Sequence, residues 1–385
     1  MSRLPLEGDA GQAMDGFAAN DRGRVTLALA GDTMLGRGVA GVLASTPSGS
    51  LFAPEIVEAV READLAVSNL ECCISTRGSP WPERGKPFFF RAPPAAAEAL
   101  SQLGVDCVTL ANNHALDFGP VALLDTIEHL RAAGVAAVGA GADLEEARSP
   151  VVLEANGFRL AVIGVTDHPE GFEAGPGRPG VALARLARGV PDWLLQTVRS
   201  ADADAVLVTP HWGPNMATRP LRPNQIAAQH ILAAGATVIA GHSAHLFQGV
   251  DGPVLYDLGD FIDDYATDPV LRNDLGLLFL LTLERSGPVR LEALPLKLEY
   301  CHTRPADGAD EAWIHRRFRR ACAHFGTRVT TEGRRLVIDW TPEERRTAWR
   351  RLEASRRRPP QTAASGSPGS PGRARLPGDR DAEER

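Results

Sequence analysis

The chain has 385 residues, of which 44% are hydrophobic and 23% are charged, and its formal net charge at pH 7 is −7. This length and apolar content are sufficient for one large or two ordinary domains with a sizeable core. The acidic balance argues against nucleic acid as a partner, and the longest apolar runs, such as residues 275–281, are too short to cross a bilayer.

The first 22 residues are polar and rich in glycine, which predicts a flexible N-terminal segment (1–22) without the apolar core of a signal peptide. We therefore expect a cytoplasmic protein that does not insert into a membrane. The five cysteines follow no disulfide framework, so reduced thiols are expected. Adjacent cysteines rarely share one tetrahedral metal, so buried, inert thiols are the better interpretation of Cys72 and Cys73.

Two apolar runs in the first part of the chain lead to carboxylates. Residues 25–30 predict a buried strand before Asp32, and residues 65–68 predict another before Asn69 and Glu71. Each carboxylate is well placed to bind a metal, although a turn or helix-capping role is the simpler explanation of Asp32 considered alone. Helical patterns occur at residues 54–63, 94–103, 120–133, 191–200 and 222–234.

A long loop is expected at residues 75–94, which are rich in Gly, Pro and Arg. It contains the segment KPFFFR, residues 86–91. This segment either covers the site or holds an anionic substrate, or it is an apolar plug with two solvated charges. The sequence favours neither interpretation.

The stretch ANNHALDFG, residues 111–119, gathers several polar functional groups in a short space. An apolar run at residues 105–110 precedes it and a helical pattern follows, so it lies at a strand-to-helix junction, where open α/β sheets place their chemistry. Asn113 can offer a metal its carbonyl oxygen, His114 can move a proton, and Asp117 can fix the imidazole tautomer. An N-capped turn is the alternative interpretation.

Further polar residues follow three apolar runs in the second half of the chain. The runs lie at residues 205–209, 237–240 and 254–258, followed by a two-stranded meander at 275–284 and 289–298. His211 and Trp212 end the first run, where a packed core histidine is the alternative to a ligand. His242 and His245 follow the second run and are spaced as a metal-binding pair. Asp260 follows the third run.

The carboxyl ends of strands in an α/β sheet converge on one edge, so these polar residues are expected to meet. The mixed oxygen and nitrogen donors suit one or two divalent ions such as Mn, Zn or Fe, rather than Ca or a thiolate cluster. Two such ions can activate water and hold a phosphoryl or acyl oxygen. The expected ligands are Asp32, Glu71, Asn113, His211, His242 and His245.

Six motifs resemble those of the CapA (poly-gamma-glutamate capsule biosynthesis) family, which in turn resembles the calcineurin-like metallophosphoesterases. The motifs run in order through residues 26–298: LALAGDTMLGRG, SNLECCIS, LANNHALDFG, VTPHWGPN, IAGHSAHLFQGV and VLYDLGDFIDDY. The resemblance implies an α/β fold, a four-layer α/β/β/α sandwich over residues 23–300, and metal ligation by the six residues above. It also implies that His114 and Asp117 act as the catalytic pair of the 5'-nucleotidase branch, in which the histidine stabilises charge or serves as general acid.

Two positions depart from the phosphoesterase pattern. Met34 stands where a metal-binding histidine is usual, and a thioether is a poor ligand for hard divalent ions. One metal site is then incomplete, weakly occupied, or completed by Asp260 or water. Glu71 stands where aspartate is usual. Four residues are expected behind the ligands or against the substrate: Asn69, Asn112, Trp212 and Asp260.

Two functions fit these features. The first is a metal-dependent hydrolase that cleaves a phosphoester or a peptide-like bond in a small-molecule or polyglutamate-like anionic substrate. The second is a non-catalytic accessory subunit of a polymer synthesis or export complex, with partners from capsule synthesis. An accessory to a membrane synthase would more often carry an anchor, and the lack of an apolar span favours the hydrolase.

Beyond residue 300 the composition changes. Residues 301–358 predict an Arg-rich helical C-terminal extension, with helical patterns at 312–325 and 342–358. Residues 359–385 consist of Pro, Ser, Gly and charged residues with almost no apolar content, which is typical of a disordered tail.

Overall fold

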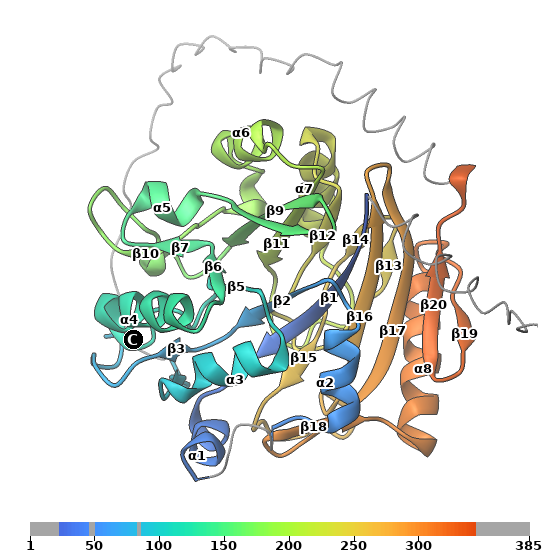
Figure 1. Ribbon diagram of the computed structural model, residues 1–385, viewed down its shortest axis with the longest axis horizontal. Helices are drawn as coiled ribbons and strands as arrows, with labels where there is room; N and C mark the ends of the chain where they lie inside the picture. The colour runs from blue at the N-terminus through green and yellow to red at the C-terminus, as the bar shows by residue number, and fades with distance from the viewer. Residues whose placement is uncertain (1–22, 46–50, 83–85, 344–385) are drawn as a thin grey trace, which may run out of the picture.

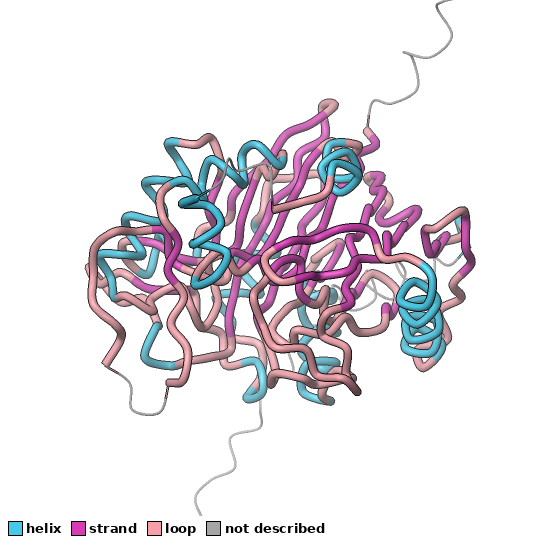
Figure 2. Tube along the Cα trace, turned by 90° about the horizontal axis from the view of Figure 1, so that it is seen from below, coloured by secondary structure: helices cyan, strands magenta, loops and turns pink. Residues whose placement is uncertain are grey.

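The computed structural model describes residues 23–45, 51–82 and 86–343. The predicted N-terminal segment and tail lie outside these residues, as do residues 344–358 of the last helical pattern. Within the described part, strands gather in the middle of the molecule and helices lie around them (Figure 2).

The larger sheet is built around β1 (Arg24–Thr33), which has parallel neighbours on one side and antiparallel neighbours on the other. The parallel side consists of β2 (Leu65–Leu70), β5 (Cys107–Thr109) and β6 (Ala136–Val138). The antiparallel side consists of β16 (Leu275–Glu284), β17 (Gly287–Glu299), β20 (Arg335–Asp339) and β19 (Thr330–Glu332). Two shorter strands join the sheet beside this path: β15 (Asp260–Ile262) on β1 and β18 (His302–Pro305) on β17.

The smaller sheet has six strands, in which β11 pairs in parallel with β12 on one side and with β9 on the other. Its strands in order are β13 (Val250–Asp251), β14 (Val254–Leu255), β12 (Val238–Ala240), β11 (Ala205–His211), β9 (Phe158–Thr166) and β8 (Val151–Ala155). Two short strand pairs complete the set: β7 (Ala140–Gly141) with β10 (Gly180–Val181), and β3 (Cys73–Ile74) with β4 (Arg91–Ala92).

Side chains of β1 alternate between two cores, as the two-residue period of a strand requires. Leu27 and Leu29 belong to a central core that also contains Leu207 of the smaller sheet, so the two sheets pack face to face. Ala28 and Ala30 belong to a second core on the outer face of the larger sheet. Because alanine is small, helices can approach this face closely.

Helices cover the outer face of each sheet (Figure 1). The larger sheet is covered by α1 (Arg37–Ser45), α2 (Pro54–Arg61), α3 (Ala95–Leu103) and α4 (Gly119–Ala132). The smaller sheet is covered by α5 (Leu144–Arg148), α6 (Asp192–Ser200) and α7 (Arg222–Ala234), and α8 (Gly308–Ala323) packs against the central core. The α/β prediction is confirmed, and the three cores order the layers as helices, sheet, sheet and helices. No helix within the described ranges is long and apolar enough to cross a membrane.

Residues 302–339 continue the larger sheet through β18 and β20, and the sequence did not predict these strands. β20 is a short strand in which Leu336 and Ile338 fill the central core. Arg335, the first residue of β20, forms ion pairs with Glu292 and Glu62 at N–O distances of 2.8 and 2.6 Å. Two inward side chains between charged residues are too short a pattern to identify a strand without its partner β17.

All five cysteines are free thiols, as predicted, and the burial predicted for Cys72 and Cys73 extends to the other three. Burial raises the pKa of Cys73 and of Cys107 to about 12. Both side chains are therefore protonated thiols at neutral pH, which makes them poor metal ligands and poor nucleophiles.

Asp125 on α4 fixes the chain that follows β3. Its carboxylate accepts hydrogen bonds from Ser75 Oγ at 2.6 Å and from Arg77 Nε at 3.0 Å. The bond to Arg77 holds the pKa of Asp125 at about 2, below the value of 3.8 for a free aspartate.

We expect Asp125→Asn to lower the free energy of unfolding at pH 7 by on the order of 1 kcal/mol. A carboxyl whose pKa is lower in the folded chain adds stability above its unfolded pKa, and this stability is lost as the pH falls toward about 2. Urea denaturation of both proteins from pH 7 to the lowest pH at which they fold should show a shrinking difference. If the difference in free energy of unfolding does not change with pH, the lowered pKa of Asp125 is not its cause.

Candidate metal centre

The ends of five strands bring most of the predicted site residues together. β1 and β2 pair so that Asp32 lies opposite Asn69, and β15 places Asp260 opposite Asp32. In the smaller sheet, the ends of β11 and β12 place His211 beside His242. The two sheets therefore deliver carboxylates from one side and imidazoles from the other.

The donors form two groups that could each hold a metal ion, and both contain Asp32. One group is Asp32, His211 and His242, and the other is Asp32, Glu71 and His245, all buried. Asp32 Oδ1 lies 3.7 Å from His242 Nδ1, whereas Oδ2 lies 3.3 Å from His245 Nδ1. Each carboxylate oxygen of Asp32 therefore faces a different group.

Two histidines of the first group point their Nδ1 atoms at each other. The distance from His211 Nδ1 to His242 Nδ1 is 2.8 Å, and His242 Nε2 lies 2.9 Å from Thr209 Oγ1. Burial lowers the pKa of His242 to about 4 and that of His211 well below its usual value, so both rings are neutral at pH 7. Neutral imidazole is the form that ligates metals.

Buried oxygens without partners provide a test of whether this set fits a cation. Both carboxylate oxygens of Glu71, Oδ1 of Asn113 and Oδ2 of Asp260 are buried and accept no hydrogen bond from the described residues. Burial, followed by the charge of Asp32, raises the pKa of Glu71 well above its usual value. Unpaired buried carboxylates are costly, and a divalent cation would supply the missing partner. The donor set therefore fits one or two divalent ions.

The loop that carries His242 and His245 has a strained backbone. Ser243 and His245 adopt φ angles of 118° and 57°, in the left-handed region that non-glycine residues rarely occupy. Hydrogen bonds hold this conformation: Ser243 N donates to Asp32 Oδ2 at 3.3 Å, and Ala244 N donates to Asp257 Oδ2 at 2.8 Å. Gly241 is required before it, because a Cβ there would lie 2.3 Å from the carbonyl oxygen of Tyr256.

The side-chain amides of Asn69 and Asn112 lie behind Asp32. Asn69 Nδ2 donates to Asp32 Oδ1 at 2.7 Å, and Asn112 Nδ2 donates to Asn69 Oδ1 at 3.0 Å. Burial opposes ionisation of Asp32, but His245, His242 and Asn69 outweigh it and lower the pKa of this carboxyl. Asp32 is therefore held as an oriented carboxylate.

His114 lies beside the ligands and belongs to neither group. Its Nδ1 is 2.6 Å from Asp117 Oδ2, and its Nε2 is 4.0 Å from Glu71 Oε1. Burial lowers the pKa of His114, although Asp117 opposes this effect. The Phe90 ring stacks on the imidazole with centroids 4.0 Å apart, which fixes its plane.

The segment 86–91 closes over this pair. Lys86 Nζ lies 3.0 Å from Asp117 Oδ1 and donates to the carbonyl oxygen of Asn113 at 2.8 Å, and its side chain is only 10% exposed. Phe90 N donates to Asp117 Oδ2 at 2.7 Å. The segment therefore covers the His114–Asp117 pair. It is not an apolar plug with solvated charges, because Phe88 is 54% exposed and Lys86 is buried in an ion pair.

Three further residues that the sequence singled out lie in different surroundings. Asp260 Oδ1 is 2.8 Å from His245 Nδ1, the nitrogen that also faces Asp32, so Asp260 lies beside the second ligand group. The Trp212 indole lies in the outer core and donates to the carbonyl oxygen of Tyr256 at 2.8 Å, so its ring does not join the polar site. Met34 is fully buried in the core under the helices, where its Sδ accepts a hydrogen bond from Gly36 N at 3.1 Å.

Two further residues of the site were not expected from the sequence: Asp257, which is buried, and Tyr265, which is partly buried. Asp257 accepts hydrogen bonds from Ala244 N and Gly259 N, and the Tyr265 ring lies edge-on to His245 with centroids 5.4 Å apart. Both fall within or just after the VLYDLGDFIDDY motif, and only its clustering of acids could have signalled them.

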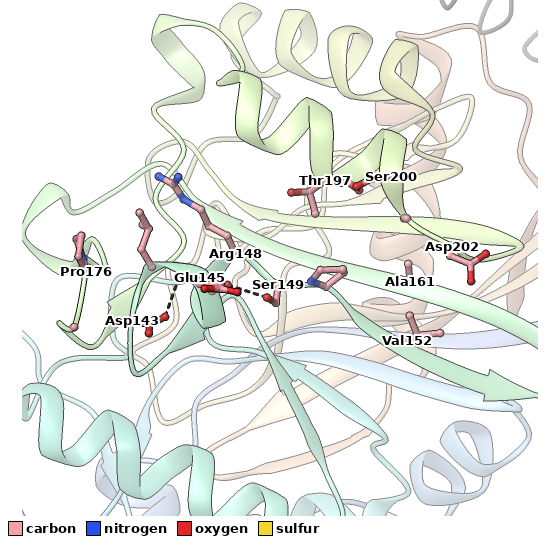
Figure 3. Close-up of a pocket in the computed structure, with 14 residues that line it drawn as sticks. Asp143, Glu145, Arg148, Ser149, Val152, Ala161, Pro176, Thr197, Ser200 and Asp202 are labelled. Carbon is pink, nitrogen blue, oxygen red and sulfur yellow. Dashed lines mark hydrogen bonds between the residues drawn. The ribbon is translucent and has the colours of Figure 1, made fainter.

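A cavity of about 720 Å³ lies elsewhere, between α5, β8 and α6 (Figure 3). Its lining includes Asp143, Arg148, Thr197 and Asp202 and none of the ligands described above. The candidate metal centre is therefore separate from this cavity.

Comparison with known proteins identifies relatives over most of the chain. Residues 26–265 match the family described as bacterial capsule synthesis protein PGA_cap. A probable polyglutamine synthesis accessory protein of Mycobacterium tuberculosis is 34% identical over 295 residues, 71% of this chain and 76% of the relative. The capsule biosynthesis protein CapA of Bacillus anthracis is 27% identical over 297 residues, 74% of this chain and 70% of the relative.

The chain therefore belongs to the PGA_cap family of bacterial capsule synthesis proteins, and the resemblance to CapA is confirmed. Among solved structures, a hypothetical protein from Thermus thermophilus is 18% identical and covers 72% of this chain and 95% of its own, with a TM-score of 0.38. This likeness is too weak to bear on function.

Proposed function

We propose that the protein is a metal-dependent hydrolase of capsule polymer metabolism, acting on a phosphoester or peptide-like bond of an anionic substrate. The observation that carries the proposal is the pair of buried ligand groups sharing Asp32, with the His114–Asp117 pair directly beside them. Divalent ions bound by these groups would polarise the scissile bond and activate water.

The protein's own contribution is proton transfer at His114. Asp117 accepts the Nδ1 proton, so Nε2, on the side of Glu71, is left free to take up and release a proton at the substrate. Lys86 neutralises the second oxygen of Asp117, and Phe90 excludes water from one face of the ring. The imidazole is thereby held in one tautomer and one orientation.

An accessory role without turnover is the second candidate, and two observations favour it. Met34 provides no ligand where phosphoesterases place a histidine. The mycobacterial relative is itself described as a probable accessory protein of polyglutamine synthesis. In this case the centre would bind metal or polymer, and the partners would be proteins of capsule synthesis.

Metal analysis combined with a substrate panel distinguishes the two functions. Protein purified without chelator is expected to contain Mn, Zn or Fe and to hydrolyse at least one of a phosphomonoester, a phosphodiester and a γ-glutamyl peptide. Activity should disappear with chelator and return with metal. Metal-loaded protein that turns over none of these substrates would favour the accessory role instead.

A further inference from the structure

A second polar site lies on α8, outside the candidate metal centre. A cavity of about 620 Å³ is bounded by α8, by residues 218–220 and by Gly249. Four arginines and one histidine line it, with two aromatic rings: Arg219, Arg316, Arg317, Arg320, His324, Trp313 and Phe325. No acidic residue of the described chain is among the lining residues.

Three of the four arginines lie on one face of α8. Residues 313, 316, 317, 320 and 324 follow one another at intervals of one, three or four, which places them along one side of an α-helix. The opposite side buries Ile314 and Phe318 in the central core. At a rise of about 1.5 Å per residue, the basic face from Arg316 to His324 extends about 12 Å.

These arginines lack the acidic partners that other arginines around α8 possess. Arg272 pairs with Asp310 at 2.7 Å and Arg334 with Glu311 at 3.2 Å, whereas Arg316 and Arg320 meet no carboxylate among the described residues. A surface that keeps several cations together without counter-charges is suited to an anionic ligand.

The strongest indication that this pocket takes an anionic ligand comes from Arg317. Its Nη1 donates to the carbonyl oxygen of Leu271 at 3.1 Å, but its Nη2 is buried and has no hydrogen-bond partner in the described residues. The guanidinium lies 5.2 Å from the ring centroids of both Phe247 and Trp313, which hold it in place. A buried guanidinium nitrogen without a partner is costly, and an anionic oxygen would satisfy it.

The loop that carries two candidate metal ligands reaches this pocket through Gly249. Phe247 lies two residues after His245, and Gly249 lines the pocket. A Cβ at Gly249 would lie 2.4 Å from the carbonyl oxygen of Ala321, so the loop packs directly against α8. A ligand in the pocket therefore contacts the loop that shapes the metal centre.

We propose that this pocket binds a chain of carboxylates, an acidic polypeptide of the polyglutamate type. Arginine forks match carboxylate geometry. A basic face about 12 Å long spans roughly four residues of an extended peptide, at about 3.3 Å per residue, so one chain can engage several arginines at once. A single phosphate would contact only one end of this basic face. The inference rests on the substrate class of the proposed function, but it does not require hydrolysis.

Binding of labelled polyglutamate tests this inference without measuring turnover. We compare the full-length protein with Arg316→Glu/Arg320→Glu and with the control Arg131→Glu/Arg199→Glu. The control changes the net charge by the same amount at exposed arginines on α4 and α6. Wild type and control should bind equally, and the α8 variant should bind about ten- to a hundredfold more weakly. Monomeric glutamate should compete poorly, since it cannot span the face.

Two results would overturn the inference. One is equal polyglutamate binding by both double variants. The other is tighter binding of a single-stranded oligonucleotide of equal charge, which would indicate a nucleic-acid or unspecific cationic surface. Since no turnover is measured, an inactive protein that still binds through α8 would refute the hydrolase and leave this site intact.

Discussion

Asp32→Ala is expected to abolish metal binding by both ligand groups, because both contain Asp32. Elemental analysis of protein purified without chelator should find divalent metal in the native chain and almost none in the variant. A ligand that binds only the folded chain stabilises it by mass action, about 2.7 kcal/mol at a concentration of 100 times Kd. Added Mn or Zn should therefore raise the melting temperature of the native protein and leave that of Asp32→Ala unchanged.

Two control variants make this prediction specific. His211→Ala affects one group only, so it should retain metal in the group of Glu71 and His245. Asp125→Asn lies outside the centre and should keep the native metal content despite its lower stability. Native metal content in Asp32→Ala, or a melting temperature of the native chain that does not respond to metal, would refute the centre.

His114→Ala is expected to lower the rate of hydrolysis by about 10²–10⁴-fold while metal content stays native. The substitution removes the atom that transfers the proton, Nε2, but keeps the backbone N–H that donates to Asn112 Oδ1 at 3.0 Å. The loop should therefore keep its shape. Steady-state kinetics on whichever substrate the native protein turns over, together with elemental analysis, measures both effects.

Asp117→Asn and His129→Ala serve as comparisons for His114→Ala. Asp117 orients the ring and does not reach the substrate, so its substitution should cost less rate. It should also lower stability, because it leaves the Lys86 ammonium buried without its charge partner. His129, on the far end of α4, should affect neither rate nor metal content. Loss of metal in His114→Ala would make His114 a ligand and contradict its assignment as a proton carrier.

Much of the candidate metal centre could be predicted because its residues lie in short sequence segments that can be recognised one by one. Each of β1, β2, β11 and β12 contains an apolar run followed by a polar side chain. Parallel pairing of β1 with β2, and of β11 with β12, brings these ends together within each sheet. The pattern of donors indicated divalent metal for the same reason, since it depends only on residue types. The two amides behind Asp32 followed from their position in the same motifs.

The parts that could not be predicted depend on packing between distant segments. Nothing in the sequence shows that the two oxygens of Asp32 face different histidines, because this depends on the distance between the two sheets. The burial of Lys86 against Asp117 depends on the path of a long loop across α4. β20 also could not be predicted, because its two core residues identify a strand only when its pairing with β17 is known.

The buried cysteines give the molecule a set of internal probes. Cys107 and Cys322 lie in the core between the sheets, whereas Cys72 and Cys301 lie in the core beneath the helices of the larger sheet. An alkylating reagent can reach a buried thiol only when the surrounding structure opens. The order in which these thiols react under native conditions therefore reports which layer of the sandwich separates first, without any added label.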